Sequence, residues 1–336
     1  MRYLPPVVAL ALLAAACGAD AAGTADDTSD AGATVDAAGG GTTYPLTVQN
    51  CGVDVTFDAP PERVVMLESA PVTVLHGLGV LDAAVLRAGA FPAEYYDDAT
   101  NEAIAGIESL GEDVDESGHL QISQEVIIAQ QPDLVIGLPD GITREGLAGV
   151  GINALVQPVY CPNGVEATTF DDVYEQIESM GQIFDRAEAA GELVSELRDR
   201  VEAVEASVEG APERTAAVLF PTVGGGSGYA YGNRSMAHPQ LEAAGFTNVF
   251  ADVDERVFEV TLEQIIAADP DVLVLLHVDG DPDAVKNAVL SLPGAEGLRA
   301  VQNDDILVQL FNFTEPPTPL SIDGLERIAE RFGTGR

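Results

Sequence analysis

Basic residues are scarce in this chain of 336 residues, which has 15 lysines and arginines against 55 aspartates and glutamates. Lys286 is the single lysine, and the formal net charge is −40 at pH 7. Such a surface repels nucleic acids and anionic lipids, so the composition argues against a nucleic-acid-binding role. It favours a well-solvated surface, and any attraction for a cationic ligand is screened over roughly 8 Å at physiological salt.

Long apolar runs are also missing, and no stretch approaches the ~20 residues that a transmembrane helix requires. The N-terminus carries only a short apolar segment, in which Arg2 precedes PPVVALALLAAA and Cys17 follows three alanines. A positive residue, an apolar segment and small residues before a cleavage point are typical of a secretory signal. The alanines before Cys17 resemble the lipobox of bacterial lipoproteins, although Leu13 stands four residues before the cysteine instead of the usual three.

This pattern predicts a signal peptide over residues 1–16 and a lipid on Cys17, with a plain secreted protein as the alternative. Residues 17–43 predict a flexible tether, because a segment dominated by Ala, Gly, Asp and Thr cannot bury enough surface to offset its ordering entropy. We therefore expect an extracytoplasmic protein that a lipid anchors to the outer face of the cell membrane, with no other membrane contact.

Cysteine is rare, with three residues in the chain. If Cys17 carries a lipid, Cys51 and Cys161 remain, and an exported chain lies in an oxidising compartment. We expect these two cysteines to form a disulfide, with two separate thiols as the alternative. Two isolated cysteines without a neighbouring histidine do not suggest a metal site.

The body of the chain alternates short apolar runs with helical patterns, and its length suits about two domains. Nearly continuous apolar runs bounded by turn residues are typical of buried parallel strands. They occur at 64–67, 84–89, 133–137 and 154–159, and again at 216–220, 272–277 and 306–311. This alternation predicts an α/β fold with two Rossmann-like lobes, each with a parallel sheet, over residues 44–168 and 210–336.

Residues 169–209 separate the two lobes and keep a three-four apolar spacing throughout. Thr169 and Asp172 resemble an N-terminal capping box, and Gly210 with Pro212 ends the pattern. The spacing predicts one long interdomain helix that joins the lobes, with Gly181 and Gly191 as points where it could bend. A coiled coil is the alternative.

One phrase occurs twice, as EVIIAQQPDLVI at 125–136 and as EQIIAADPDVLV at 263–274. Each copy predicts a helix that ends before Pro-Asp and is followed at once by a buried strand. The repetition indicates two structurally equivalent lobes. Glu125 and Glu263 occupy the same place in the two copies, and stabilisation of a helix N-terminus is the simplest explanation for a carboxylate there.

Several segments together resemble the substrate-binding lipoproteins of ABC importers for ferric siderophores, vitamin B12 and haem. They are YPLTVQNCGVDVTF at 44–57, PPERVVML at 60–67, the two Pro-Asp phrases, the long helical segment, and HPQLEAAGFTNVFAD at 238–252. The resemblance implies a monomer with two lobes on a rigid helix, a ligand in the cleft, and no enzymatic activity or cofactor. The expected ligand is an Fe(III)-siderophore complex.

The same resemblance implies a partner and a docking mode. In this family one surface glutamate of each lobe contacts arginines of the two permease subunits, and Glu125 and Glu263 match those positions. The expected partner is therefore an ABC permease dimer with its ATPase subunits. ATP hydrolysis would belong to that partner.

Ligand-binding residues are expected in the loops at the C-terminal ends of the parallel strands. Aromatic faces with a fixed cation suit a bulky chelate whose faces are organic and whose edges carry oxygens. The candidates are Glu68, Ser69, Tyr95 and Tyr96 in the first lobe, and Tyr229, Tyr231, Arg234, Arg256, Phe311 and Phe313 in the second. For each aromatic residue, packing in the core is the alternative.

Other ligands of the same importer type stay open. Cobalamin sites in this family use tryptophan, which this chain lacks, whereas haem could use Tyr229, Tyr231 or His238. Zinc or manganese needs converging histidines and carboxylates, and His76, His119, His238 and His277 are scattered. The glycine run at 224–228 fits no nucleotide-binding motif, and no hydrolase or His-Glu-x-x-His motif occurs, so the motifs do not suggest an enzyme.

Overall fold

The computed structural model describes residues 41–111, 120, 122–162, 164, 167–223, 228–278 and 280–333. All of these belong to one compact unit, which begins at Gly40. The predicted signal peptide, Cys17 and nearly all of the tether lie outside the described residues, as do His119 and positions 224–227 of the glycine run. None of the helices in the described ranges is long and apolar enough to cross a membrane.

The first sheet has five parallel strands in the order β5-β4-β3-β6-β7. Its strands are β3 (Val64–Met66), β4 (Ala84–Arg87), β5 (Glu108–Ser109), β6 (Leu134–Ile136) and β7 (Asn153–Leu155). The helices of this lobe are α1 (Val72–Gly77), α2 (Asp98–Ala105), α3 (Gln124–Ala129) and α4 (Arg144–Ala148). Every residue of the central strands β3 and β6 is buried, which explains their unbroken apolar sequences.

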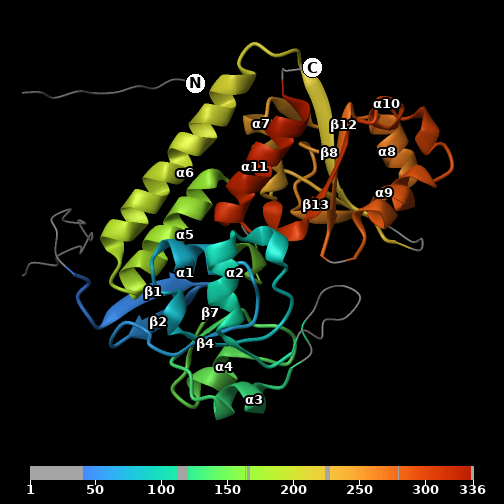
Figure 1. The fold of residues 1–336 in the computed structure, drawn as a ribbon. Coiled ribbons are helices and arrows are strands. Elements are labelled where there is room, and N and C mark those ends of the chain that lie inside the picture. Colours follow the sequence, from blue (N-terminus) through green and yellow to red (C-terminus); the bar gives the residue numbers. More distant parts are fainter. Residues whose placement is uncertain are drawn as a thin grey trace, which may run out of the picture. The chain divides into compact units, whose positions relative to one another are not determined.

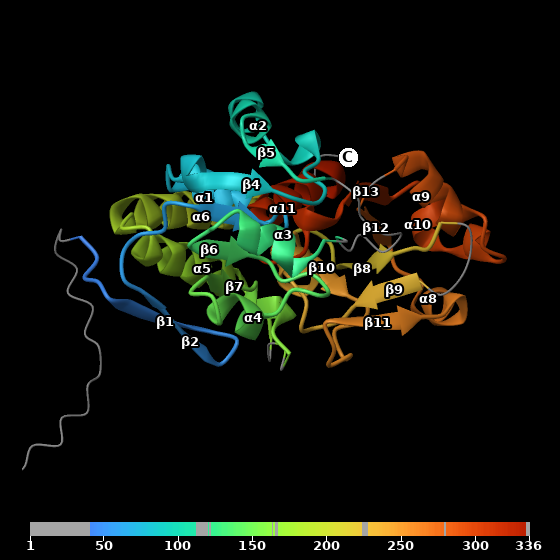
Figure 2. The same ribbon diagram turned by 90° about the horizontal axis from the view of Figure 1, so that it is seen from below.

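The second sheet has the order β11-β9-β8-β12-β13, and β10 also pairs with β8. Its strands are β8 (Arg214–Phe220), β9 (Gly228–Tyr231), β10 (Phe246–Asn248), β11 (Val257–Val260), β12 (Val272–His277) and β13 (Ile306–Leu310). The helices are α7 (Ala237–Ala243), α8 (Leu262–Ala268), α9 (Pro282–Leu290), α10 (Arg299–Gln302) and α11 (Pro319–Phe332). Figure 2 shows β4, β6 and β7 apart from β8, β9 and β11, as expected for two lobes.

The prediction of a parallel sheet is wrong at one edge of the second lobe. The strands β9 and β11 run antiparallel to their neighbours, whereas β8, β12 and β13 are parallel. The connection from β8 to β9 spans only residues 221–227 and contains no helix in its described part. Parallel neighbours need a crossover of a dozen or more residues, so a connection this short produces a hairpin.

The predicted single interdomain helix is two helices, α5 (Phe170–Ile183) and α6 (Ala187–Val208). The chain reverses between them at Asp185, whose φ of 55° is left-handed, and the N–H of Arg186 bonds the carbonyl of Gly181 at 2.6 Å. The two helices lie side by side (Figure 1). The apolar spacing continues through the break because both helices bury a face in the same core. The capping box of Thr169 and Asp172 is confirmed.

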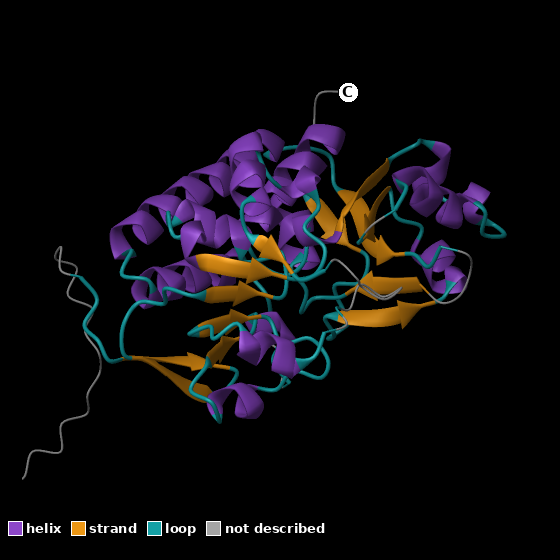
Figure 3. Cartoon of the chain, turned by 60° about the horizontal axis from the view of Figure 1, so that its bottom comes forward, coloured by secondary structure: helices purple, strands orange, loops and turns teal. Residues whose placement is uncertain are grey.

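Helix α6 is the element that connects the two lobes. Its 22 residues span about 33 Å at 1.5 Å per residue. It packs against α1 of the first lobe and against α7 and α11 of the second. One hydrophobic cluster accordingly runs from the first sheet through these helices to the second sheet, and Figure 3 shows the helices gathered along both groups of strands.

The twin Pro-Asp phrases have the same structural role in both lobes. The carboxylate of Asp133 accepts hydrogen bonds from the backbone N–H groups of Glu62 and Arg63 at 2.7 and 3.0 Å. Asp271 accepts from the backbone N–H and the hydroxyl of Thr215 at 2.8 and 3.0 Å. Each aspartate therefore ties the start of its own strand to the start of the neighbouring strand, β3 or β8.

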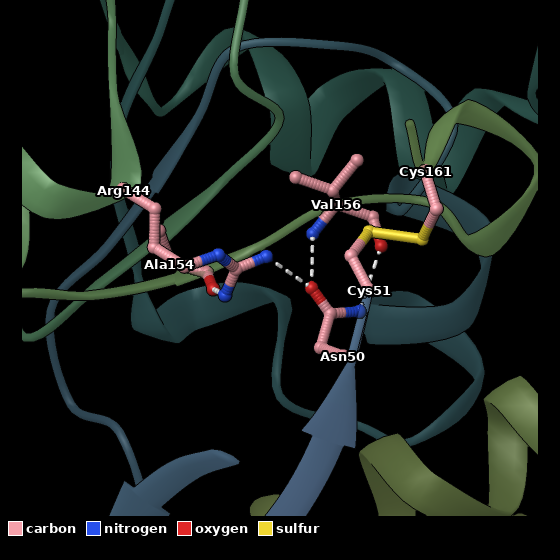
Figure 4. The surroundings of a disulfide bond; sticks show 6 residues. All are labelled: Asn50, Cys51, Arg144, Ala154, Val156 and Cys161. Carbon is pink, nitrogen blue, oxygen red and sulfur yellow. Dashed lines mark hydrogen bonds between the residues drawn. A yellow bond between two sulfur atoms is a disulfide. The ribbon is translucent and has the colours of Figure 1, made fainter. Parts of the chain in front are cut away.

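A separate hairpin, β1 (Leu46–Asn50) and β2 (Val53–Phe57), precedes the first sheet. Its two-residue turn places Cys51 and Gly52 at positive φ, and Cys51 forms a disulfide with Cys161. Beside the disulfide, the Asn50 amide donates to the Val156 carbonyl at 2.8 Å and accepts from the Val156 N–H at 2.9 Å (Figure 4). The hairpin is thereby fastened to the segment that follows β7.

Candidate ligand-binding site

A cavity of about 890 Å³ lies between the two lobes. The first lobe contributes the segments after β3, β4, β6 and β7, and the second contributes the last residue of β8, the segments after β12 and β13, and Arg256. These are C-terminal ends of strands, where α/β folds form their ligand sites. The volume falls within the ~300–1,000 Å³ that is typical of small-molecule sites.

Four of the ten predicted ligand residues line this cavity. They are Glu68, Ser69, Arg256 and Phe311. Phe311 follows β13, and its ring meets that of Phe220 edge to face with 6.2 Å between the centroids. Together they form an aromatic wall on the side of the second lobe.

Another group of predicted residues lies in the interior. Tyr95 and Phe313 are buried with their rings 5.2 Å apart, and Tyr96 packs edge to face on Tyr95. Tyr95 accepts a hydrogen bond from the Asn312 N–H at 2.9 Å, and the Asn312 amide donates to Ser69 at 3.0 Å. These residues connect the two lobes directly, next to the cavity.

The remaining candidates, Tyr229, Tyr231 and Arg234, lie on the second lobe outside the cavity lining. Tyr231 is buried, whereas Tyr229 borders a separate hollow of about 560 Å³ beside α8 and α9. The guanidinium of Arg234 forms a bidentate pair with Asp254, with both N···O distances 2.7 Å. Arg234 is therefore held by a neighbouring carboxylate.

An ion pair and an aromatic ring meet at the cavity wall. Glu315 is fully buried, accepts from the Met236 N–H at 2.9 Å, and lies 3.3 Å from a guanidinium nitrogen of Arg256. Burial raises the pKa of Glu315, and the charge of Arg256 opposes that shift. Arg256 also stacks over the ring of Tyr160, at 5.3 Å from the centroid. First-lobe Tyr160 and second-lobe Arg256 thus meet across the cavity.

Tyr160 is the residue that sequence reasoning missed most clearly. It ends the 3₁₀ turn η3 (Pro158–Tyr160) and directly precedes Cys161, so the disulfide fixes its backbone. The residue is 38% exposed and lines the cavity. Burial and the charges of Glu315 and Glu68 raise the pKa of this tyrosine well above its usual value. An aromatic residue next to a predicted disulfide was the available signal.

Glu68 is a carboxylate in a poorly solvated part of the cavity. It follows β3, and its side chain lies against Gly137, where an added Cβ would come within 3.1 Å of Glu68 Cγ. Burial raises the pKa of Glu68 to about 7, and a hydrogen bond from Gln157 lowers it only in part. Within the described residues its Oε1 atom is buried and has no hydrogen-bond partner.

The two glutamates of the repeated phrases are exposed and equivalently placed. Glu125 is the second residue of α3 and Glu263 the second residue of α8. Neither lines the cavity. In the described ranges, no group of three or more His, Cys, Asp and Glu residues is placed to hold a metal ion.

The chain belongs to the periplasmic binding protein family, whose pattern it matches over residues 64–308. This confirms the predicted resemblance and the two-lobed α/β class. Members of this family are solute-binding proteins, which confirms that the chain is not an enzyme.

Among solved structures, a protein of an ABC-type Fe³⁺-hydroxamate transport system from Saccharomonospora viridis is 73% identical, with a TM-score of 0.83. The match covers 87% of this chain and 100% of that one. A periplasmic haem-binding protein of Vibrio cholerae shares the fold, with 19% identity and a TM-score of 0.63. The match covers 80% of this chain and 97% of that one. A cobalamin-binding protein of Halobacterium salinarum is 25% identical over 296 residues, 86% of this chain and 74% of that protein.

Proposed function

We propose that the protein captures a ferric hydroxamate siderophore in the cavity between its lobes and delivers it to an ABC importer. The observation that carries this proposal is the 73% identity, over 87% of the chain, to a protein of an Fe³⁺-hydroxamate transport system. At this identity most cavity-lining positions are expected to be shared, whereas the haem-binding relative supports only the fold.

The cavity chemistry supports a bulky organic chelate. Tyr160, Phe220 and Phe311 provide flat apolar surfaces, and Arg256 provides a cation that Glu315 holds in place. Aromatic faces bind the organic surface of a chelate, and a guanidinium donates hydrogen bonds to oxygens at its edge. Both lobes contribute to this arrangement, so a bound ligand would favour the state in which they are close.

Cobalamin is the second candidate, because a cobalamin-binding protein is 25% identical over 296 residues. Both candidates keep the fold and the importer role and differ only in the cargo. Haem, zinc and manganese remain further arms of the test.

Delivery requires a partner, and the exposed glutamates of the repeated phrases suit that role. Glu125 and Glu263 lie on different lobes, away from the cavity. We propose that each contacts arginines of one subunit of a permease dimer, whose ATPase subunits supply the energy. Exposed ion pairs of this kind steer association and fix its register.

The expected location follows from the N-terminal sequence. We propose that residues 1–16 are removed as a signal peptide, that Cys17 is lipidated, and that residues 17–43 tether the folded body to the outer face of the membrane. Mass spectrometry of the membrane-bound protein would show a diacylglycerol adduct on Cys17. A protein found only in the medium, with no lipid, would contradict the anchor.

The proposed function is tested by titrating the full-length protein with a ligand panel. The chain has no tryptophan, so its eight tyrosines, Tyr160 among them, report binding by fluorescence. The panel contains ferric hydroxamates, a ferric catecholate, haem, cobalamin, Zn²⁺ and Mn²⁺, with thermal shift as a second readout. We expect a saturable response to ferric hydroxamates. A response to cobalamin or haem alone would replace the cargo and keep the importer role.

A further inference from the structure

The charged residues that line the cavity are mostly acidic. They are Glu68, Asp140 and Glu145 against Arg144 and Arg256. Asp140 and Glu145 are exposed, so water and salt screen their charges. Glu68 is only partly exposed, and its charge acts through a less polar surrounding. The carboxylate of Glu68 is therefore the most influential negative charge for a molecule inside the cavity.

Both arginines of the cavity already have partners. Arg256 pairs with Glu315, which offsets its charge within the protein. The guanidinium of Arg144 donates to the Asn50 side-chain oxygen at 2.6 Å and to the Ala154 carbonyl, as Figure 4 shows. Its donors are used to fasten the β1–β2 hairpin. Arg256 is balanced by Glu315, whereas Arg144 keeps its positive charge but has donors engaged by neutral oxygens, so the acidic residues of the lining outnumber its arginines.

Glu68 has no cationic partner in the part of the chain that the structure describes. Its oxygen Oε1 has no hydrogen-bond partner, and the hydrogen bond of its carboxylate comes from the neutral amide of Gln157. Gln157 is itself bonded to Gln176, so this polar group holds no positive charge. A buried carboxylate without a counter-charge is unfavourable, and a ligand cation would relieve it.

We infer that the cavity selects ferric chelates by charge, accepting neutral or cationic complexes, and that Glu68 is the specificity-determining residue, favouring chelates with a pendant ammonium group. The inference rests on the proposed function and narrows its ligand class. Three singly charged hydroxamates neutralise Fe³⁺, whereas three doubly charged catecholates leave the complex a trianion. A trianion would be repelled by the carboxylate of Glu68, which has no cationic partner among the described residues, and a neutral core with an ammonium arm would supply the missing counter-charge.

The test uses a pair of ligands that differ in one charge. Ferrioxamine B carries a pendant ammonium group, and its N-acetylated form is neutral with the same iron centre. At pH 8 we expect the full-length protein to bind ferrioxamine B about tenfold more tightly than the acetylated form, as for a hydrogen bond between charged groups in a sheltered site. Ferric enterobactin, a trianion, is expected to show no saturable binding.

Two variants test whether the preference for ferrioxamine B depends on Glu68. Glu68→Gln is expected to remove the difference between the two ligands by weakening ferrioxamine B alone. Glu178→Gln removes the same charge from an exposed position of α5, outside the cavity lining, and is expected to leave the difference unchanged. Circular dichroism and thermal melting check that both variants fold, and the comparison of the two ligands on the native protein does not depend on either.

Three results would overturn the inference. Equal affinity of the native protein for ferrioxamine B and its acetylated form would show that the cavity does not select the ammonium group. Tight binding of ferric enterobactin would show that the cavity does not exclude anionic chelates. In both cases hydroxamates still bind, so the proposed function stands. If no ferric hydroxamate binds at all, the proposed function fails and the inference fails with it.

Discussion

At the scale of the residue, two carboxylates near the cavity differ in what surrounds them. Glu315 is fully buried but has Arg256 and the Met236 N–H as partners. Among the described residues, Glu68 has only the amide of Gln157 as a partner, and burial raises its pKa to about 7. The partners of Glu315 offset part of the desolvation that raises its pKa. Glu68 is left as a group whose ionisation costs free energy in the folded protein.

The charge of Glu68 predicts a specific dependence of stability on pH. Because its pKa rises from 4.5 to about 7 on folding, the native state keeps a proton that the unfolded chain has already lost between these values. The native state therefore loses stability as the pH rises through this window. Glu68→Gln is expected to match the native protein at pH 4 and to exceed its free energy of unfolding by roughly 2–3 kcal/mol at pH 8.

Urea denaturation at several pH values measures this difference. Tyr160, Arg256 and Glu315 face the same cavity wall, but they are present in both proteins and cancel in the comparison. Glu145→Gln, at an exposed position, is the control and should show little change. A constant stability difference between pH 4 and pH 8 would show that Glu68 is not desolvated.

At the scale of the element, the α5–α6 hairpin depends on one close approach. A Cβ at Gly181 would lie 2.4 Å from the Cβ of Ala190, whereas nothing lies within 4 Å of a Cβ at Gly191. Gly181→Ala is expected to destabilise the protein by about 1–3 kcal/mol through overpacking. Gly191→Ala, in the interior of α6, should stabilise it by roughly 0.5–1 kcal/mol because alanine favours the helix.

Thermal melting of the two variants separates the explanations. Both glycines lie inside helices, so helix propensity alone predicts stabilisation at both positions. Opposite signs support the close packing of α5 on α6. Stabilisation by both substitutions would contradict it and would favour a single straight helix.

The β1–β2 hairpin also depends on one link, the disulfide between Cys51 and Cys161. Replacing both cysteines by serine is expected to lower the free energy of unfolding by roughly 2–4 kcal/mol, because the unfolded chain gains freedom over 110 residues. Since Tyr160 precedes Cys161, ligand affinity should fall as well. Denaturation and ligand titration measure the two effects, and unchanged affinity would show that the Asn50 and Val156 bonds alone position Tyr160.

The elements were largely predictable from the sequence, and the contacts between them were not. Buried strands and the repeated phrases have local signals, so both sheets and both Pro-Asp steps were found. The reversal at Asp185 was not predicted, because the spacing of apolar residues indicates which helix face is buried but not whether the chain turns back. Tyr95 and Phe313 follow strands as ligand residues do, but their rings pack together in the interior. Arg256 was found beside its strand, whereas its pairing with Glu315 brings together residues far apart in sequence.

At the scale of the whole molecule, the two lobes share one hydrophobic cluster through α1, α5, α6 and α11. Arg200 of α6 adds ion pairs to Asp323 and Glu326 of α11, with N···O distances of 2.5 and 2.6 Å. Such a continuous core favours small hinge motions over wide opening of the lobes. The protein is therefore expected to present the two glutamates of its repeated phrases at a nearly constant separation.

The docking role predicts a separation of binding from uptake. Replacing Glu125 and Glu263 by alanine is expected to reduce ferric hydroxamate uptake by roughly tenfold, because charge contacts to the permease are lost. Ligand affinity should not change, since neither residue lines the cavity. Replacing Glu178 and Glu205, which are exposed on α5 and α6, removes the same charge and should preserve uptake. Normal uptake by the variant that lacks Glu125 and Glu263 would show that these residues do not dock the protein onto the permease.

The measurement that tests the central claim most directly is equilibrium dialysis of the full-length protein against ferrioxamine B loaded with radioactive iron. For the native protein we expect saturation at one iron per chain. For Phe311→Ala, which removes part of the aromatic wall, we expect about tenfold weaker binding at the same stoichiometry. No retained iron, or retention that is identical in the two proteins, would contradict capture of a ferric hydroxamate between the lobes.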